Sequence, residues 1–241
     1  MELMFGADSI LERGKGLTFD DVLMVPRHST INSRKIPVLT SQVTKNYKID
    51  IPIVTANMDT ITEAPMACAM AKLGGLGILH RFMDVEDQVK QVKEIINFQN
   101  ENKLNTPIAA SIGVKEEGMK RADYLVDAGV QILTLDIAHG DSVMMLEVLE
   151  YVKNKYPNID VIAGNVATPD GVRRLIEAGA DSVKVGIGPG SMCTTRIITG
   201  HGVPQLTAVA LGVSEAKRHG IPVIADGGIK TSGDIVKALS A

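Results

Sequence analysis

A cysteine within a glycine-rich turn is the residue of this chain best suited to covalent chemistry. Residues 184–196, KVGIGPGSMCTTR, place Cys193 shortly after an apolar, strand-like run. The glycines at 186, 188 and 190 permit φ > 0 and leave room for a ligand near the backbone, whose N–H groups can then face an anion. A thiolate is a strong nucleophile where its surroundings favour it. We interpret Cys193 as a candidate nucleophile, with the hydroxyl of Thr195 within proton-transfer reach.

The chain's only other cysteine has the surroundings of a core position. Cys68 lies in EAPMACAMAKLGG among alanines and methionines at helical spacing. A free cysteine in such a place usually acts as a small buried hydrophobic residue. We therefore expect Cys68 to pack in the core.

A second glycine-rich loop offers contacts to a nucleotide. In DGGIKTSGD, Asp226 follows an apolar run and precedes two glycines. The carboxylate can accept hydrogen bonds from ribose hydroxyls, and the N–H groups of Gly227 and Gly228 can bind phosphate. Together with Ser191, these residues predict a cradle for a nucleoside monophosphate.

Other polar residues leave alternatives open. Asp136, at the end of ILTLDIAHG, could hold a ribose or could cap the following helix. His80 and His139 are acid–base candidates or hydrogen-bonded structural residues. The spacing of His, Cys and carboxylates does not favour a transition metal. Backbone carbonyls of the turn, at Gly188, Gly190 and Cys193, could instead coordinate a monovalent cation such as potassium.

The elements that must position these residues alternate between strand and helix. Helix-period segments separate the apolar runs and several end in glycine, which indicates parallel strands covered on both faces. We predict a (β/α)₈ TIM barrel, with a doubly wound open sheet as the alternative. Polar residues follow the strand ends, where barrel enzymes carry their chemistry: Asn57, Asp59, His80, Asp136, Asn165, Cys193 and Asp226. The predicted strands are 51–56, 76–79, 107–113, 132–138, 160–165, 182–188 and 221–228, and the clearest helices are 85–96, 118–129, 170–179 and 209–220.

Seven strands are one fewer than a closed barrel needs, and the sequence stops inside SGDIVKALSA. Either the N-terminal segment completes the barrel, or the chain is truncated after the seventh strand unit, which we favour. No Pro/Ser-rich linker divides the sequence, so we expect residues 1–241 to form a single barrel domain.

Composition narrows the classes of partner. The 241 residues carry a net charge of −3, with Lys and Arg dispersed, which argues against nucleic acid. No apolar run reaches membrane-spanning length and no signal peptide is evident, so we expect a cytoplasmic protein. The remaining class is a small anionic ligand.

Five longer strings are similar to one enzyme family. GLTFDDVLMVPRHST, ANMDTITE, AGNVATPDGV, KVGIGPGSMCTTR and IADGGIKTSGDIVKAL all resemble the family of IMP dehydrogenase and GMP reductase, and the similarity extends nearly end to end. The resemblance implies that Cys193 attacks C2 of a purine nucleotide, forming a covalent adduct, while a nicotinamide cofactor exchanges hydride with C2.

Local strings favour the reductase branch of that family. INSR contains Ser33 and Arg34, which resemble a pair that meets the cofactor phosphate of a neighbouring subunit, and LHRF contains Arg81, which could hold the extra phosphate of NADPH. Only FQNENKLNT joins two elements where many dehydrogenases carry a regulatory CBS-type module. We predict an NADPH-dependent GMP reductase that converts GMP to IMP and ammonia. The alternatives are an NAD-dependent IMP dehydrogenase that makes XMP, and a non-catalytic purine-nucleotide-binding fragment.

The resemblance also assigns roles residue by residue and implies a homotetramer. It places the family's flap and the glutamate partner of Thr195 beyond position 241. Thr195 would assist proton transfer. The substrate would contact Met58, Ser191, Asp226, Gly227 and Gly228, and the cofactor would contact Ser33, Arg34, Arg81, Asp136, Ile137 and Ala138.

Overall fold

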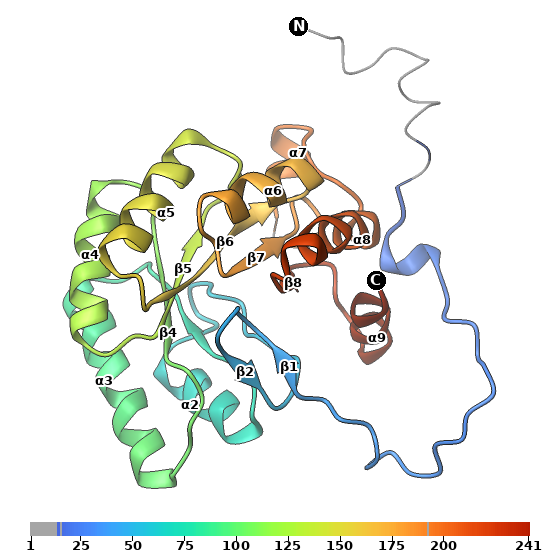
Figure 1. The fold of residues 1–241 in the computed structure, drawn as a ribbon, viewed down its shortest axis with the longest axis horizontal. Helices are drawn as coiled ribbons and strands as arrows, with labels where there is room; N and C mark the ends of the chain where they lie inside the picture. The colour runs from blue at the N-terminus through green and yellow to red at the C-terminus, as the bar shows by residue number, and fades with distance from the viewer. Residues whose placement is uncertain (1–13, 15, 192) are drawn as a thin grey trace, which may run out of the picture.

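A curled parallel sheet of six strands forms the centre of the molecule (Figure 1). The computed structural model describes residue 14, residues 16–191 and residues 193–241. The strands are hydrogen-bonded in chain order: β3 (Ile78–Leu79), β4 (Ala109–Ile112), β5 (Ile132–Asp136), β6 (Asp160–Val166), β7 (Ser182–Val185) and β8 (Val223–Ala225). All five pairings are parallel. This arrangement confirms the predicted (β/α) barrel class, because a doubly wound sheet would reverse its strand order.

Helices cover the outer face of the curled sheet. They are α2 (Ala64–Leu73), α3 (Val85–Asn102), α4 (Glu116–Asp127), α5 (Val143–Lys155), α6 (Pro169–Glu177) and α8 (Gln205–Ala216). The last helix, α9 (Ser232–Ser240), follows β8 and lies beside α8 and residues 19–21. A single turn, α7 (Thr195–Ile198), follows β7, and a short 3₁₀ segment, η2 (Lys217–His219), extends α8. The four helices predicted at 85–96, 118–129, 170–179 and 209–220 all form, as α3, α4, α6 and α8. No helix in the described part of the chain has the length and hydropathy needed to cross a membrane.

Two apolar layers hold the sheet. The larger packs the outward-facing side chains of the strands against the helices and includes Cys68, as expected. The smaller fills the inside of the curl with alternate strand residues, among them Ile78, Ala109, Ile132 and Ile162. Because both faces are covered, every residue of β4 and β7 is buried.

The predicted first strand, 51–56, is present only as a single bridge. Val54 pairs in parallel with Leu76, and Thr55 N–H donates to the Leu76 carbonyl at 2.9 Å. Pro52 supplies no N–H donor and Ile53 N–H is used locally, donating to the Ile51 carbonyl at 2.8 Å. The segment therefore lies beside the sheet edge without forming a regular strand.

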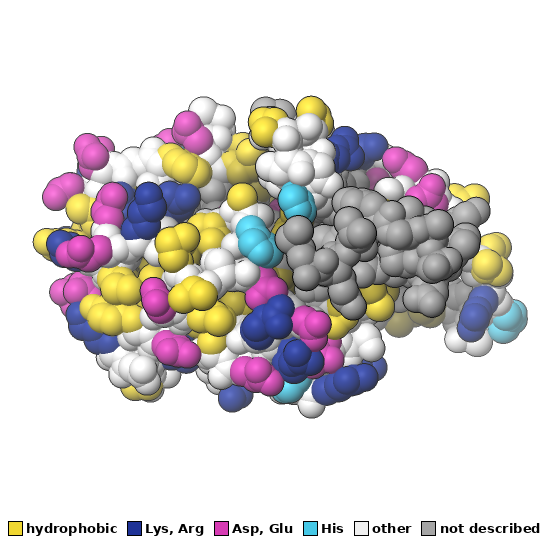
Figure 2. All heavy atoms as spheres, turned by 90° about the horizontal axis from the view of Figure 1, so that it is seen from above, with side chains coloured by type: hydrophobic (Ala, Val, Ile, Leu, Met, Phe, Trp, Pro, Cys, Tyr) yellow, Lys and Arg dark blue, Asp and Glu magenta, His cyan; other side chains and the backbone are white. Residues whose placement is uncertain are grey.

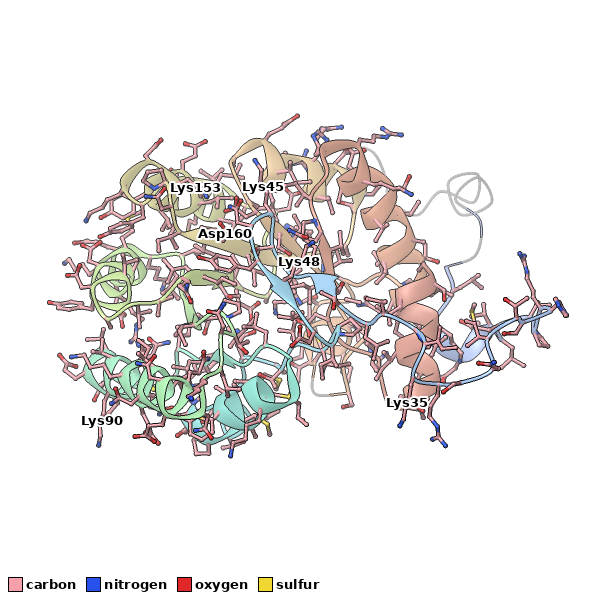
Figure 3. All side chains as sticks on the ribbon, turned by 60° about the horizontal axis from the view of Figure 1, so that its bottom comes forward. Lys35, Lys45, Lys48, Lys90, Lys153 and Asp160 are labelled. Carbon is pink, nitrogen blue, oxygen red and sulfur yellow. The ribbon has the colours of Figure 1, made fainter. Side chains whose placement is uncertain are left out.

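A hairpin that sequence periodicity does not reveal covers the amino ends of the strands. It consists of β1 (Ser41–Gln42) and β2 (Lys48–Ile49), which pair antiparallel. Its turn binds Asp160 at the start of β6: Thr44 Oγ1 donates to Oδ2 at 2.5 Å and Asn46 Nδ2 to Oδ1 at 2.7 Å. Figure 3 shows Lys45 of this turn near Asp160, with the side chain of Lys35 far away. The hairpin thus closes the end of the curl opposite the loops that follow the carboxyl ends of the strands.

The N-terminal part of the described chain is divided between a docked segment and an exposed arm. Phe19, in the 3₁₀ turn η1 (Phe19–Asp21), is buried, and its carbonyl accepts from Lys237 Nζ at 2.8 Å. Residues 22–40 then run as an extended arm away from the sheet and helices (Figure 1).

Candidate active site

A buried lysine joins the carboxyl ends of two strands. Lys184 is the third residue of β7 and only 5% exposed. Its Nζ lies 2.6 Å from Asp226 Oδ2 and 3.1 Å from Asp136 Oδ2. Asp136 ends β5 and Asp226 directly follows β8, so one ammonium group is shared by two carboxylates inside the curl.

Two asparagines complete this polar cluster. Asn57 Nδ2 donates to Asp136 Oδ2 at 2.6 Å. Asn165 Nδ2 donates to Asp226 Oδ2 at 2.9 Å and to the carbonyl of Gly186 at 2.8 Å. Asn57 follows the predicted strand 51–56 and Asn165 lies near the end of β6, and the structure brings both to the same place as the two aspartates. The carboxylates are therefore fixed in orientation before any ligand binds.

The opposite charges of the cluster keep the buried lysine and Asp226 ionised. Burial alone would lower the pKa of the Lys184 ammonium, but the charges of Asp226 and Asp136 hold that pKa above its ordinary value. Burial alone would raise the pKa of the Asp226 carboxyl. The charge of Lys184, together with hydrogen bonds from Lys184 and Asn165, outweighs burial, so the pKa of Asp226 is lowered. At neutral pH the site holds a buried cation between two carboxylates.

Cys193 is a half-buried, free thiol on the loop after β7. The hydrogen bond from the Thr195 hydroxyl lowers the pKa of this thiol; partial burial opposes the effect, and backbone hydrogen bonds from Thr195, Gly188 and Arg196 add to it. The other cysteine differs, since burial raises the pKa of the Cys68 thiol. A lowered pKa increases the thiolate fraction at neutral pH, which is what a nucleophilic cysteine needs.

The two glycine-rich loops lie against each other, as a shared cradle requires. A Cβ on Gly227 would lie 3.1 Å from Pro189 Cγ and 3.2 Å from Gly190 N, and Gly190 O accepts from Cys193 N–H at 3.1 Å. Gly227 and Gly228 both adopt positive φ, at 93° and 79°. The Cys193 loop and the loop after Asp226 therefore form one continuous surface.

Gly186 makes the closest approach between the two strands. A Cβ built there would lie 1.9 Å from the carbonyl oxygen of Asp226. No side chain can occupy that space, so glycine is required for the loop after β7 to leave the sheet beside β8.

Two of the predicted cofactor residues line one cavity. Arg81 and Ile137 border a space of about 300 Å³, together with Gly113 and Arg121. The Arg81 guanidinium lies 4.7 Å from the centre of the Phe82 ring. Asp136 of the lysine cluster directly precedes Ile137, and Ala138, which directly follows it, is exposed.

The other predicted contacts are spread more widely. Ser33 and Arg34 lie on the exposed arm, away from the lysine cluster of their own chain, and Met58 and Ser191 are exposed. His80 is buried, and its Nδ1 accepts from Phe82 N–H at 3.1 Å, which fits the structural alternative for this residue. On the face that Figure 2 views from above, charged side chains of both signs are interspersed and histidines lie near the middle.

Among the described residues, no group of three or more His, Cys, Asp or Glu side chains could hold a metal ion. A cation held by carbonyls is a different case. Gly190 O already accepts from Cys193 N–H, and a carbonyl oxygen has a second lone pair for a cation. The assignment of Gly188, Gly190 and Cys193 to a potassium ion stays a prediction.

Sequence reasoning missed Lys184, the centre of the cluster. The signal was a charged residue within the otherwise apolar run SVKVGIG. A lysine there must be buried, and a buried lysine requires anionic partners. Strand-end aspartates on neighbouring strands were the natural candidates.

The fold and the site together define a (β/α) barrel protein with a cysteine loop beside a second glycine-rich loop. A family model described as "IMP dehydrogenase / GMP reductase domain" matches residues 16–241, and the chain belongs to this family.

Curated relatives named inosine-5'-monophosphate dehydrogenase are similar to the chain. The one from Cryptosporidium parvum is 45% identical over 264 residues, covering 94% of this chain and 65% of that protein. Those from Borreliella burgdorferi and Aquifex aeolicus are 37% and 35% identical, each over 94% of this chain and over 67% and 71% of the relatives. The chain thus spans about two thirds of the length of these relatives.

Proposed function

We propose that the protein is a purine nucleotide oxidoreductase that oxidises IMP at C2 to XMP with NAD. The names of the similar dehydrogenases support this alternative better than the GMP reductase and NADPH predicted from local strings. The observation that carries the proposal is the thiol of Cys193, with a lowered pKa, on a loop packed against Gly227 and beside Asp226.

In this proposal the protein first binds and orients the nucleotide. Asp226, already fixed by Lys184 and Asn165, accepts hydrogen bonds from ribose hydroxyls. Backbone N–H groups of Gly227, Gly228 and Ser191 bind the phosphate, since successive N–H groups in such turns form an anion-binding concavity. The purine ring then lies over the loop of Cys193.

The chemical step follows from the thiolate. Cys193 Sγ adds to C2 of the purine and forms a C–S bond, with its charge held beforehand by the Thr195 hydroxyl. When bound, NAD accepts the hydride that leaves C2. Water then replaces sulfur at C2, which releases XMP and restores the thiol. The cavity bordered by Arg81 and Ile137 is the space we assign to the dinucleotide.

Paired assays test the proposal. The protein is incubated with IMP and NAD, and separately with GMP and NADPH, while nicotinamide absorbance is followed. Turnover of IMP with NAD supports the dehydrogenase, and turnover of GMP with NADPH alone overturns it in favour of the reductase. If neither pair reacts while either nucleotide binds in calorimetry, the non-catalytic alternative replaces it. The expected homotetramer is measured on the same sample by light scattering.

A further inference from the structure

Two buried glutamines make the same unusual contact at different places in the sheet. Gln88 of α3 is fully buried, and its Nε2 donates to the carbonyls of His80 and Ser111, both at 3.0 Å. His80 directly follows β3, and Ser111 is the third residue of β4. One side-chain amide therefore ties two neighbouring strands together.

Gln205 of α8 repeats this arrangement between β7 and β8. It is 2% exposed, and its Nε2 donates to the carbonyls of Val185 at 2.9 Å and Asp226 at 3.0 Å. Val185 ends β7 and Asp226 directly follows β8.

Both amides act at the carboxyl ends of the strands, where the ladders finish. The last register pair of β3 and β4 is Leu79 with Ala110, and Gln88 joins the two residues that follow. The last pair of β7 and β8 is Val185 with Ala225. Each glutamine thus fixes the positions from which two adjacent loops depart.

The two pairs of loops have different contents. Gln88 Oε1 also accepts from Arg121 Nη1 at 2.9 Å, and Gln88 Nε2 holds the carbonyl of His80, the residue before Arg81. Arg81 and Arg121 both border the 300 Å³ cavity. Gln205 instead joins the start of the Cys193 loop to Asp226, and its Nε2 lies 3.0 Å from where a Cβ on Gly186 would be.

We propose that Gln88 and Gln205 are positioning residues with separable effects. Gln88 sets the geometry of the cavity bordered by Arg81 and Ile137, and Gln205 holds the Cys193 loop against the loop after Asp226. This inference rests on the proposed function for the identity of the two ligands. The alternative is a purely structural role, in which both amides only provide hydrogen bonds to buried carbonyls. In that case the loss of either amide would affect turnover, binding and alkylation alike.

Three matched variants test the inference. Gln88→Met and Gln205→Met keep the side-chain size and remove the donors. Gln99→Met is the control, because Gln99 is also buried on α3 but donates to no described strand end. For each variant we measure kcat, KM for IMP and NAD, the calorimetric Kd of IMP, and the rate of Cys193 alkylation by iodoacetamide.

We expect the two variants to affect different measured properties. Gln205→Met lowers kcat about 10- to 100-fold, as a displacement near 1 Å can, and changes Cys193 alkylation, while KM for NAD stays within twofold. Gln88→Met raises KM for NAD about tenfold and leaves both alkylation and the Kd of IMP unchanged. Gln99→Met changes none of these.

Equal losses of all properties in both variants would overturn the inference. If a methionine variant does not fold by circular dichroism, Gln88→Leu or Gln205→Leu replaces it, since leucine is also uncharged and has no donor. Alkylation and IMP binding need no turnover. If the proposed reaction does not occur, the effect of Gln205 on Cys193 can therefore still be measured. An unchanged alkylation rate in Gln205→Met would overturn the role of Gln205 without affecting that of Gln88.

Discussion

Lys184 Nζ and Asp226 Oδ2 lie 2.6 Å apart inside the curled sheet. This ion pair connects the strand that leads to Cys193 with the strand end that carries Gly227 and Gly228. Lys184 also contacts Asp136, and Asp226 also accepts from Asn165. We therefore expect the pair to contribute both to the stability of the fold and to the candidate site.

Replacing the lysine tests that double role. Lys184→Met leaves Asp136 and Asp226 without their shared cation, which should destabilise the protein by about 3 kcal/mol or more and weaken IMP binding. Urea unfolding at pH 7.5 and calorimetry measure the two effects. An unchanged free energy of unfolding would contradict a buried, charged cluster.

The same variant makes a prediction about pH. In the native protein the pKa of Asp226 is lowered, so its stabilisation is present above the ordinary aspartate pKa and is lost as pH falls through the native value. Without Lys184, burial raises that pKa, and the charged carboxylate destabilises at neutral pH. The stability difference between variant and parent should therefore shrink between pH 7.5 and pH 5; a difference that grows would refute this sign.

Thr195 should favour the thiolate form of Cys193. Thr195→Val removes the hydroxyl that favours the thiolate, so the pKa of Cys193 should rise and the pH profile of iodoacetamide alkylation should move to higher pH. Thr194→Val, which removes the adjacent exposed hydroxyl, is the control and should leave the profile in place. Identical shifts in both variants would argue against a specific hydrogen bond.

Cys193 should be required for chemistry and dispensable for binding. Cys193→Ala should abolish turnover while the Kd of IMP changes less than about tenfold, because the covalent bond forms only during reaction. Cys68→Ala, in the core, should retain kcat. Residual turnover in Cys193→Ala would show that Cys193 is not the nucleophile.

Asp160 should affect stability without affecting activity. It is buried and accepts hydrogen bonds from Thr44 and Asn46 at the end of the sheet opposite the site. Asp160→Ala leaves these donors without their acceptor and should cost about 3 kcal/mol in urea unfolding, with kcat unchanged where the variant is folded. Glu116→Gln, which alters an exposed ion pair, should leave the unfolding midpoint unchanged.

Periodicity and turn residues were sufficient to predict most of the sheet and the meeting of the two glycine loops. Six of the seven apolar runs are strands, because parallel strands covered on both faces are apolar along their whole length. Lys184 and the two glutamines escaped prediction, since a buried polar side chain is defined by partners that only the tertiary structure brings near. The β1–β2 hairpin escaped because each strand has two residues, too few for a periodic pattern.

Two glycines of one loop differ in their freedom to vary. A methyl group at Gly186 would collide with the Asp226 carbonyl, whereas at Gly190 the nearest non-adjacent atom among the described residues is Cys193 Cβ, at 3.7 Å. Random replacement followed by selection for growth should consequently return only glycine at the first position and tolerate alanine at the second. The close approach of the two strand ends therefore leaves no room for any side chain at position 186.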